Sequence, residues 1–374
     1  MKKIKIITIL GTRPEIIRLS KIINILERYT QHKLIHTGQN FDFELNEVFF
    51  KDLKIKKPHY KLSYNKKKNL SSIETISTIL VNVEKILIKE KPEAIVILGD
   101  TNSCLSAYVA KRYKIPIFHI EAGNRCYDQR VPEEINRKII DHISDVNITY
   151  SEIAKENLLR ENLPPDRVFK IGSPLHEVYN FHKKKINDSK ILQKYSLQKQ
   201  KYFLLSVHRE ENIDYIENFN KFINFLKYLN KRNEETIIIS THPRTVKKLR
   251  KYNLRNLKNI IFAKPFSYTD YCYLQKNAKI VFSDSGSITE ESNIIGFNAV
   301  NLRYTNERQE GMSFGAVPMV HFELKKIDNL INFYEKNEYN SNNIVDYLSP
   351  NFSKIFLKIL FSYIDYINNN VWKK

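Results

Sequence analysis

Residues 3–26 read KIKIITILGTRPEIIRLSKIINIL. The apolar run at 3–10 is too short for the h-region of a signal peptide and lacks a small-residue cleavage site, so it predicts a buried β-strand. The residues after Pro14 are predicted to form a helix, because proline suits a first helical turn, where it needs no amide partner. Thr12 is a candidate N-cap. A strand therefore leads directly into a helix.

The same succession is repeated through the first half of the chain. Further apolar runs are predicted to be strands at 32–37, 93–99, 115–120 and 145–150. Helices are predicted near 70–90 and at 102–113, 134–143 and 152–161. Strands that alternate with helices in this way form a parallel, doubly wound sheet.

The pattern restarts beyond a Lys/Asn-rich segment at 176–200. Strands are predicted at 202–208, 235–240, 259–263, 278–284 and 298–303, with helices at 215–231 and 287–295. At 374 residues the chain is too long for one ordinary core. We therefore expect an α/β fold of two Rossmann-like domains, at 1–174 and 175–350, with a final helix within 351–374 that packs back across the domains.

The net charge of +20 raises the question of nucleic-acid binding. Its excess is mostly lysine spread through surface-like segments, and no nucleic-acid motif accompanies it. A solvated basic surface is the favoured interpretation, and an anionic ligand would still be attracted by the charge. Because the chain has no run of 18 or more apolar residues, we expect no membrane insertion and a cytoplasmic protein.

The three cysteines lie far apart without a CxxC pair, which argues against both a disulfide framework and a structural zinc site. Cys126 is the one near candidate chemistry. A nucleophilic role for Cys126 stays open, although no histidine is an obvious partner for its thiol.

Polar residues follow several predicted strands, where ligands of such sheets bind. After the first strand, a helix start with Arg13 and Arg18 would suit a phosphate, although a capped helix with surface arginines is the alternative. Asp100 follows the strand at 93–99 and is either functional or a helix N-cap. His208 ends the first strand of the second domain, and His242 occupies the equivalent place in STHPRT at 240–245, which suggests a shared anion site.

The segment FSDSGSITEES at 282–292 is the most phosphate-like part of the chain. Ser285, Gly286 and Ser287 offer amides and hydroxyls before a helix begins, although tight turns use the same residues. Glu291, one turn further on, could accept the two hydroxyls of a ribose.

The stretch HIEAGNRCYDQRVPEEINRK at 119–138 places many charges directly after a buried strand. Glu121 stands at the strand end, and Glu133 stands at a helix start after Pro132. Arg137 lies four residues beyond Glu133 on the same helical face. It either orients that glutamate for chemistry or forms an ordinary i,i+4 ion pair.

Nine short motifs occur in order: GTRPEIIR, HTGQN, GDTNS, HIEAGNR, VPEEINR, HREEN, STHPRT, SDSGSITEE and NERQEG. In order and spacing they resemble the non-hydrolysing UDP-N-acetylglucosamine 2-epimerase family. The resemblance implies a glycosyltransferase-B-like fold with a nucleotide sugar in the cleft between two domains. It also implies a homodimer that needs neither metal nor nicotinamide cofactor. Such enzymes invert carbon 2 of a UDP-N-acetylhexosamine by eliminating UDP to a 2-acetamidoglycal and adding UDP back.

The matched motif positions imply roles for individual residues. The resemblance assigns catalysis to Asp100, Glu121, Glu133 and His208. It assigns substrate and UDP binding to Arg13, Arg18, Arg137, His242, Ser285, Gly286, Ser287, Glu291 and Arg308. Within that set, Arg13 and the Ser285-Gly286 loop would hold the pyrophosphate, and Glu291 would bind ribose.

The amino-acid sequence of the 119–142 segment resembles enzymes that form UDP-N-acetyl-L-fucosamine, or related UDP-6-deoxy-L-HexNAc 2-epimerases, more than it resembles the UDP-GlcNAc/UDP-ManNAc enzymes. UDP-GlcNAc/UDP-ManNAc enzymes commonly have a histidine of an allosteric site where this chain has Asn40, so such activation is not expected here. The resemblance favours the L-sugar branch, in precursor synthesis for surface polysaccharides. The alternatives are a UDP-GlcNAc/UDP-ManNAc 2-epimerase, a hydrolysing epimerase and a glycosyltransferase on the same fold.

Overall fold

The computed structural model describes residues 3–38, 49–50, 52–62, 71–232, 235–241, 243–249, 252, 254, 257–337 and 344–374. The chain divides into two compact units. The first comprises Met1–Asn180 together with Asp346–Lys374, and the second comprises Phe181–Val345.

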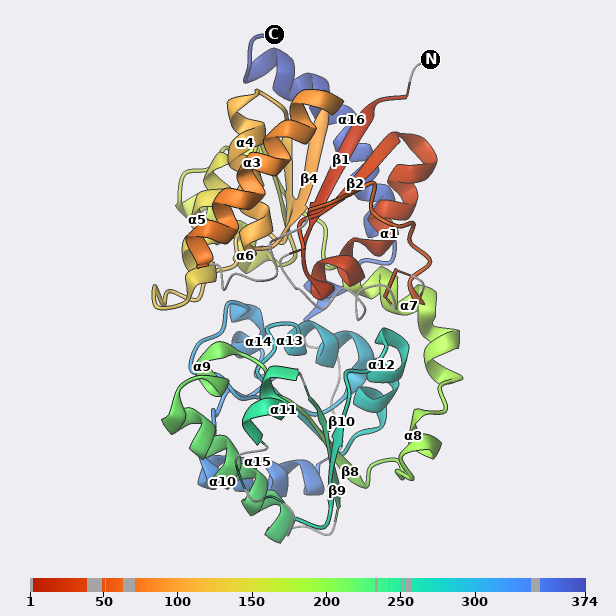
Figure 1. Cartoon of the computed structure of the whole chain (residues 1–374), viewed down its shortest axis with the longest axis vertical. Coiled ribbons are helices and arrows are strands. Elements are labelled where there is room, and N and C mark those ends of the chain that lie inside the picture. Colours follow the sequence, from red (N-terminus) through yellow and green to blue (C-terminus); the bar gives the residue numbers. More distant parts are fainter. Residues whose placement is uncertain are drawn as a thin grey trace. The chain divides into compact units, whose positions relative to one another are not determined.

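The first unit is built on a parallel sheet, which has seven strands in the described part of the chain (Figure 1). Its strands are β1 Lys5–Leu10, β2 Gln31–His36, β3 Tyr60–Lys61, β4 Ala94–Leu98, β5 Ile117–Ile120, β6 Val146–Thr149 and β7 Val168–Lys170. They lie in the order β3-β2-β1-β4-β5-β6-β7. Every residue of β4 is buried, as expected of a strand covered by helices on both faces.

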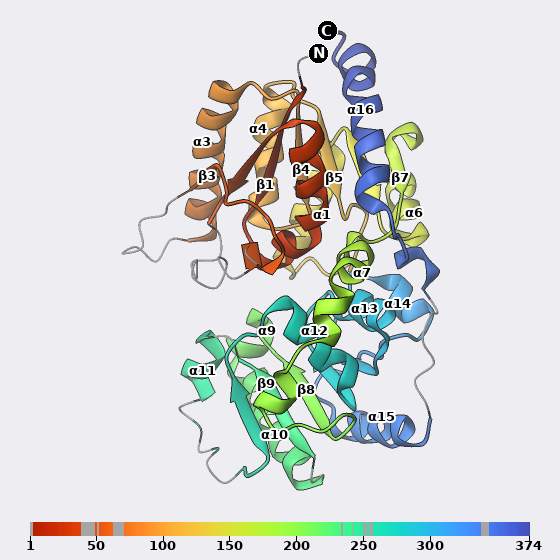
Figure 2. The ribbon, with the colours of Figure 1, turned by 90° about the vertical axis from the view of Figure 1, so that its right-hand side faces the viewer.

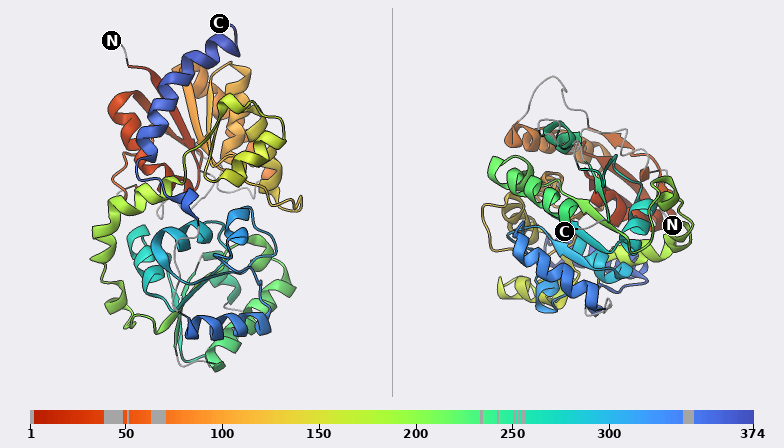
Figure 3. Two further views of the ribbon diagram at one scale, coloured as in Figure 1. Left: turned by 180° about the vertical axis from the view of Figure 1, so that it is seen from behind. Right: turned by 90° about the horizontal axis from the view of Figure 1, so that it is seen from below.

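Helices cover both faces of this sheet (Figures 1 and 2). They are α1 Arg13–Tyr29, α3 Ser72–Glu90, α4 Ala107–Arg112, α5 Pro132–Ile143, α6 Glu152–Arg160, α7 Pro174–Asn187 and α16 Phe352–Asn370, with 3-10 turns η1 Asn102–Ser106 and η2 Pro165–Arg167. The C-terminal α16 lies beside α1 on the first unit (Figure 3). There Phe356 packs edge-on against Phe118 of β5.

The second unit carries a parallel sheet in the order β10-β9-β8-β11-β12. Its strands are β8 Tyr202–Ser206, β9 Thr236–Ser240, β10 Ile260–Ala263, β11 Ile280–Ser283 and β12 Ala299–Asn301. Its helices are α8 Ile191–Lys194, α9 Glu210–Ile213, α10 Ile216–Arg232, α11 Pro243–Leu249, α12 Tyr268–Asn277, α13 Ile288–Glu291, α14 Gln309–Ser313 and α15 Leu324–Lys336. A π-helical turn, η3 Ser292–Gly296, continues α13, and η4 Val345–Tyr347 leads back to the first unit.

All ten strands predicted from apolar runs are present, and both sheets are parallel. Two short strands, β3 and β7, were not predicted. The expected division at 174 and 350 differs from the units observed, which change over at 180/181 and 345/346. The first difference arises because α7 runs unbroken through the predicted boundary. Among the described residues, no helix is long and apolar enough to cross a membrane.

Candidate active site

The loop after β1 is closed by a buried glutamate. Glu15 Oε2 accepts hydrogen bonds from the amides of Gly11 and Thr12, each at 2.7 Å, and Thr12 is the N-cap of α1 as predicted. The other oxygen, Oε1, accepts from Thr101 Oγ1 at 2.7 Å, so this carboxylate joins the β1 loop to the turn after β4. Burial raises the pKa of Glu15. Two amides just before this helix are therefore bonded to Glu15, a residue for which the sequence analysis gave no role.

Two arginines predicted to bind substrate lie on α1. The guanidinium of Arg13 is 5.1 Å from the centre of the Phe49 ring, against its face. Arg18 is buried, and its Nε lies 3.5 Å from Glu121 Oε2. The structure therefore joins Arg18 to a predicted catalytic acid.

Glu121 follows β5 in a strained backbone conformation, with φ of +71°. A non-glycine residue in this region costs on the order of 1–3 kcal/mol and persists only where its surroundings hold it. Such strain is concentrated at functional sites. The backbone thus supports the choice of Glu121 as a functional residue.

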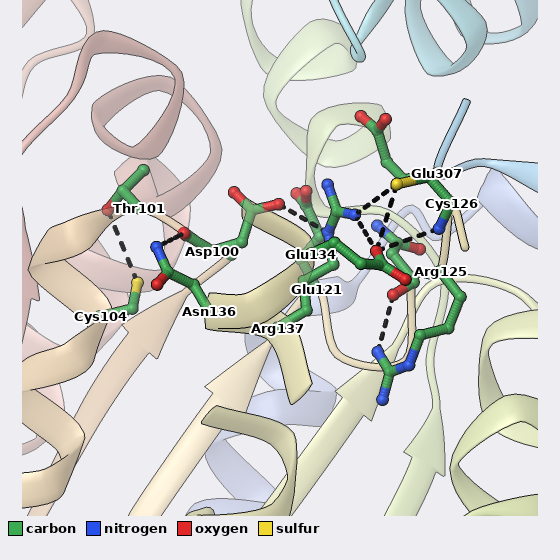
Figure 4. A network of polar contacts seen from close by, with 12 residues as sticks. Asp100, Thr101, Cys104, Glu121, Arg125, Cys126, Glu134, Asn136, Arg137 and Glu307 are labelled. Carbon is green, nitrogen blue, oxygen red and sulfur yellow. Dashed lines mark hydrogen bonds and ion pairs between the residues drawn. The ribbon is translucent and has the colours of Figure 1, made fainter. Parts of the chain in front are cut away.

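Asp100 follows the neighbouring strand β4 and is held by α5 (Figure 4). Its Oδ2 lies 2.8 Å from Arg137 Nε, and its carbonyl accepts from Asn136 Nδ2 at 2.8 Å. The N-cap of the following 3-10 turn is Thr101, so the alternative of Asp100 as a helix cap is wrong.

The second partner of Arg137 is Glu134, at 2.5 Å from Nη1. Sequence reasoning expected Arg137 to orient Glu133 and missed Glu134, which is buried, whereas Glu133 is half-exposed. Burial would raise the pKa of Glu134, but the Cys126 amide and Arg137 lower it below its ordinary value. Arg137 thus bridges the Asp100 turn and a buried carboxylate at the start of α5.

Cys126 belongs to the same network. Its Sγ lies 3.3 Å from Glu134 Oε2, and burial raises the pKa of the thiol. A thiol that is hard to ionise is a poor nucleophile. The geometry therefore disfavours the nucleophilic role left open for Cys126.

The helix α5 carried a signal that could have identified these partners. Charged residues recur on it at 134, 137 and 141, and all three are buried, while Ile135 and Ile139 on the same helix are exposed. A charged stripe at helical spacing between outward apolar residues indicates that the charges face the protein interior.

In the second unit, Asp284 follows β11 and is fully buried. It accepts hydrogen bonds from the amides of His208 and Arg209 and from Asn212 Nδ2, and His208 Nδ1 lies 3.1 Å from its Oδ1. Burial would raise the pKa of Asp284, but the charge and hydrogen bond of His208, with the other donors, lower it to about 2. This carboxylate fixes the imidazole of His208, which is 47% exposed.

The Ser285–Ser287 loop leads into the helix that carries Glu291. The Ser285 and Ser287 hydroxyls lie 2.9 Å apart, and Ser287 Oγ donates to Glu291 Oε1 at 2.8 Å. Gln275 Nε2 donates to the other oxygen at 2.6 Å. The loop and the predicted ribose-binding glutamate are thus one hydrogen-bonded unit.

Gly286 lies against Glu307 and Arg308, and a Cβ added at Gly286 would collide with Glu307 Oε1. Arg308 is buried, with Nη2 2.7 Å from Glu290 Oε2 and Nη1 3.1 Å from Glu307 Oε1. The structure therefore brings Gly286 and Arg308 together, as predicted, and adds Glu290 and Glu307 as their partners.

Two predicted positions, His242 and Asn40, lie outside the described residues. Within the described ranges, no group of three or more His, Cys, Asp or Glu side chains could hold a metal ion.

Residues 24–360 match the family model described as UDP-N-acetylglucosamine 2-epimerase. The chain belongs to this family. It is 36% identical over 338 residues to the UDP-N-acetylglucosamine 2-epimerase of Methanocaldococcus jannaschii, covering 86% of this chain and 90% of the relative. It is 31% identical to the UDP-2,3-diacetamido-2,3-dideoxy-D-glucuronate 2-epimerase of Pseudomonas aeruginosa, covering 84% and 88%. These enzymes are isomerases, and so is this member of the family.

Solved structures of the epimerase family match over the full length. The UDP-N-acetylglucosamine 2-epimerase from Rickettsia bellii is 46% identical, with a TM-score of 0.91 and 100% coverage of both chains. The M. jannaschii epimerase in complex with UDP-GlcNAc and UDP is 33% identical, with a TM-score of 0.89, covering 96% of this chain and 100% of that one. A likeness of fold alone extends to the lipopolysaccharide outer core galactosyltransferase WaaB, at 14% identity and a TM-score of 0.53, covering 96% and 99%. The predicted family and the glycosyltransferase-B-like fold are therefore confirmed.

Proposed function

We propose that this epimerase inverts carbon 2 of a UDP-N-acetylhexosamine by eliminating UDP and adding it back. The observation that carries the proposal is the pair of carboxylates Asp100 and Glu121 at the ends of adjacent strands. Each is fixed by an arginine, Asp100 by Arg137 and Glu121 by Arg18. Two positioned carboxylates suit a reaction that removes a proton from one face of a ring and returns it to the other.

The order of bond breaking follows from the substrate. The proton on carbon 2 lies beside no carbonyl, so its removal first would be prohibitive. When the bond from carbon 1 to the UDP oxygen stretches, positive charge develops on carbon 1 and the neighbouring proton becomes acidic. A carboxylate takes that proton, UDP leaves with the bonding electrons, and a 2-acetamidoglycal remains. Protonation of carbon 2 from the opposite face and return of UDP to carbon 1 complete the inversion.

We assign the departing UDP to the second unit. The Ser285–Ser287 loop offers the Ser285 hydroxyl to the pyrophosphate, since the Ser287 hydroxyl already donates to Glu291, and His208 is fixed beside the loop by Asp284. Glu291 keeps lone pairs free for ribose hydroxyls beyond its bonds to Ser287 and Gln275, because each carboxylate oxygen can accept more than one hydrogen bond. Arg308 is buried between two glutamates, so its proposed task is to hold the loop in place.

The experiment is incubation of the enzyme with a UDP-HexNAc in deuterated water without an acceptor. The elimination mechanism predicts epimerised UDP-sugar with deuterium at carbon 2. Epimerised product without the label would overturn the mechanism. Free sugar and UDP would indicate a hydrolysing epimerase, and no conversion without an acceptor would favour a glycosyltransferase.

For the substrate we propose a UDP-6-deoxy-L-HexNAc, in the formation of UDP-N-acetyl-L-fucosamine for surface polysaccharides. The amino-acid sequence of the 119–142 segment and the presence of Asn40 support this substrate. UDP-GlcNAc/UDP-ManNAc is the second candidate, favoured by the names of the relatives. Comparing kcat/KM for the two substrate classes decides between them. A higher value for UDP-GlcNAc would reject the L-sugar assignment.

We further propose that the epimerase is a homodimer, formed through the outer faces of α3, α4 and α5. These faces expose large apolar side chains, namely Val81, Ile88, Tyr108, Ile135 and Ile139. The helices that carry these side chains contact one another, α3 with α4 and α4 with α5, and a contiguous exposed apolar patch is typical of an association surface. Sedimentation velocity should give the mass of a dimer for the native chain and of a monomer for Ile135→Glu/Ile139→Glu. A monomeric native chain would contradict the proposal.

A further inference from the structure

A buried chain of alternating charges lies behind the two acids. His119 of β5 and Asp141 of α5 are both fully buried, with His119 Nδ1 2.9 Å from Asp141 Oδ1. Asp141 Oδ2 lies 2.7 Å from Arg125 Nη1, and Arg125 Nη2 lies 2.6 Å from Glu161 Oε2. Nε2 of His142, which is exposed, also lies 3.1 Å from Glu161 Oε2.

Both ring nitrogens of His119 face acceptors. Nε2 lies 2.9 Å from the carbonyl oxygen of Gly99, which has no proton to give, and Nδ1 faces the Asp141 carboxylate. Burial would raise the pKa of Asp141, but His119 and Arg125 lower it, so the carboxylate is charged. A neutral imidazole has one N–H, so one of its lone pairs would lie against an acceptor. Only the imidazolium makes both contacts attractive.

These contacts fasten the two turns that carry the proposed acids. The Gly99 carbonyl belongs to the peptide bond that leads into Asp100. On the other side, Asp141 Oδ2 accepts from the amide of Gly123 at 3.2 Å, in the turn that begins with the strained Glu121. His119, from β5, and Asp141, from α5, therefore reach the backbone of both turns.

We infer that His119, whose two ring nitrogens both face acceptors, is a positioning residue that fixes the Asp100 and Glu121 turns relative to each other. It does not touch the substrate and acts through the backbone of both acids. The inference deepens the proposed function and rests on its assignment of Asp100 and Glu121 as the proton-transferring groups.

Two nearly isosteric variants separate the two contacts. The amide nitrogen of Asn takes the place of Nδ1, so His119→Asn keeps a donor to Asp141 and loses the one to Gly99. His119→Gln places its amide nitrogen near Nε2, so it keeps the donor to Gly99 and loses the one to Asp141. The matched control is His32→Gln. His32 is a buried histidine of β2 in the same sheet, bonded to Thr8 at 2.9 Å, and burial lowers its pKa to about 3.

We expect kcat to fall by about tenfold to a hundredfold in both His119 variants, with KM within about threefold of the native value, because small displacements of catalytic groups cost this much. The His32 control should keep kcat within about twofold. His119 variants that fold and match the control in kcat would overturn the inference.

Nitrogen-15 NMR of the native enzyme provides a test independent of activity and of variant folding. At neutral pH both ring nitrogens of His119 should carry a proton, with the signal assigned by its loss in His119→Gln, or by the other histidine variants if that one does not fold. A single protonated nitrogen would overturn the inference. If the native chain converts no UDP-HexNAc, the proposed function fails while the NMR result still decides the charge of His119.

Discussion

The two units hold the carboxylates proposed to be functional in different ways. In the first unit, Asp100 and Glu121 are paired with arginines from other elements, and Arg137 lies 37 residues from its partner. In the second unit, Glu291 is held by Ser287, four residues before it, with Gln275 as a second donor. The acids of the first unit thus depend on tertiary ion pairs, whereas the loop of the second is stabilised largely by local hydrogen bonds. Substitutions should accordingly affect chemistry in the first unit and ligand binding in the second.

The largest effect is expected from Arg137→Ala. It leaves Asp100 without its cation and Glu134 buried without its ion-pair partner, so kcat should fall on the order of a hundredfold or more. The matched control is Arg130→Ala, because Arg130 is exposed and pairs locally with Asp128. Steady-state kinetics of both variants check this. An Arg137→Ala enzyme with at least a tenth of native kcat would contradict the bridging role.

Gly286→Ala tests the second unit. The added Cβ collides with Glu307, which Arg303 holds at 2.6 Å, so the loop must shift. We expect UDP to bind about tenfold more weakly by calorimetry, a cost of ~1.4 kcal/mol. Ser313→Ala is the control, because Ser313 lies exposed on α14 of the same unit. Equal UDP affinity in both variants would show that the loop does not contribute to UDP binding.

Asp284 should make the stability of the second unit depend on pH in the acid range. Its pKa is lowered from 3.8 to about 2 on folding, so its stabilising contribution is complete above about pH 4 and is lost as the pH falls through about 2. Asp284→Asn should show a shallower decline in the free energy of unfolding across that window. Urea denaturation at a series of pH values measures it. Parallel curves for the native and variant proteins would refute the assignment.

The smallest effect is expected from Cys126→Ser. The thiol has a raised pKa and lies against Glu134, where a hydroxyl can make the same contact. We expect kcat within about twofold of native. A loss of a hundredfold or more would restore Cys126 as a nucleophile.

The same contrast explains what the sequence could reveal. Strands, the Thr12 cap and the Ser285–Ser287 loop depend on neighbouring residues, so local patterns predicted them. The edge strands β3 and β7 span two and three residues, too few for an apolar run. The Lys/Asn-rich segment concealed α7, because exposed lysines are compatible with a helix as well as a linker.

The partners of the site residues were harder to predict from the sequence, because they depend on tertiary packing. Helical spacing placed both Glu133 and Glu134 within reach of Arg137, at i,i+4 and i,i+3. Which of the two glutamates is buried beside Arg137 depends on which side of α5 faces the sheet, and tertiary packing decides that side. Sequence reasoning likewise had no means of pairing Arg18 with Glu121 or Glu15 with Thr101, because these contacts join separate strand ends.

The left-handed backbone at Glu121 bears on how this family can change over time. Glycine would occupy that conformation without strain, so the chain retains a glutamate there at a cost of about 1 kcal/mol in folding stability. A member that no longer needed proton transfer would be released from this cost, and drift should replace the residue readily. On the proposed role of Glu121, we expect a glycine or asparagine at this position in a family member to mark lost epimerase activity.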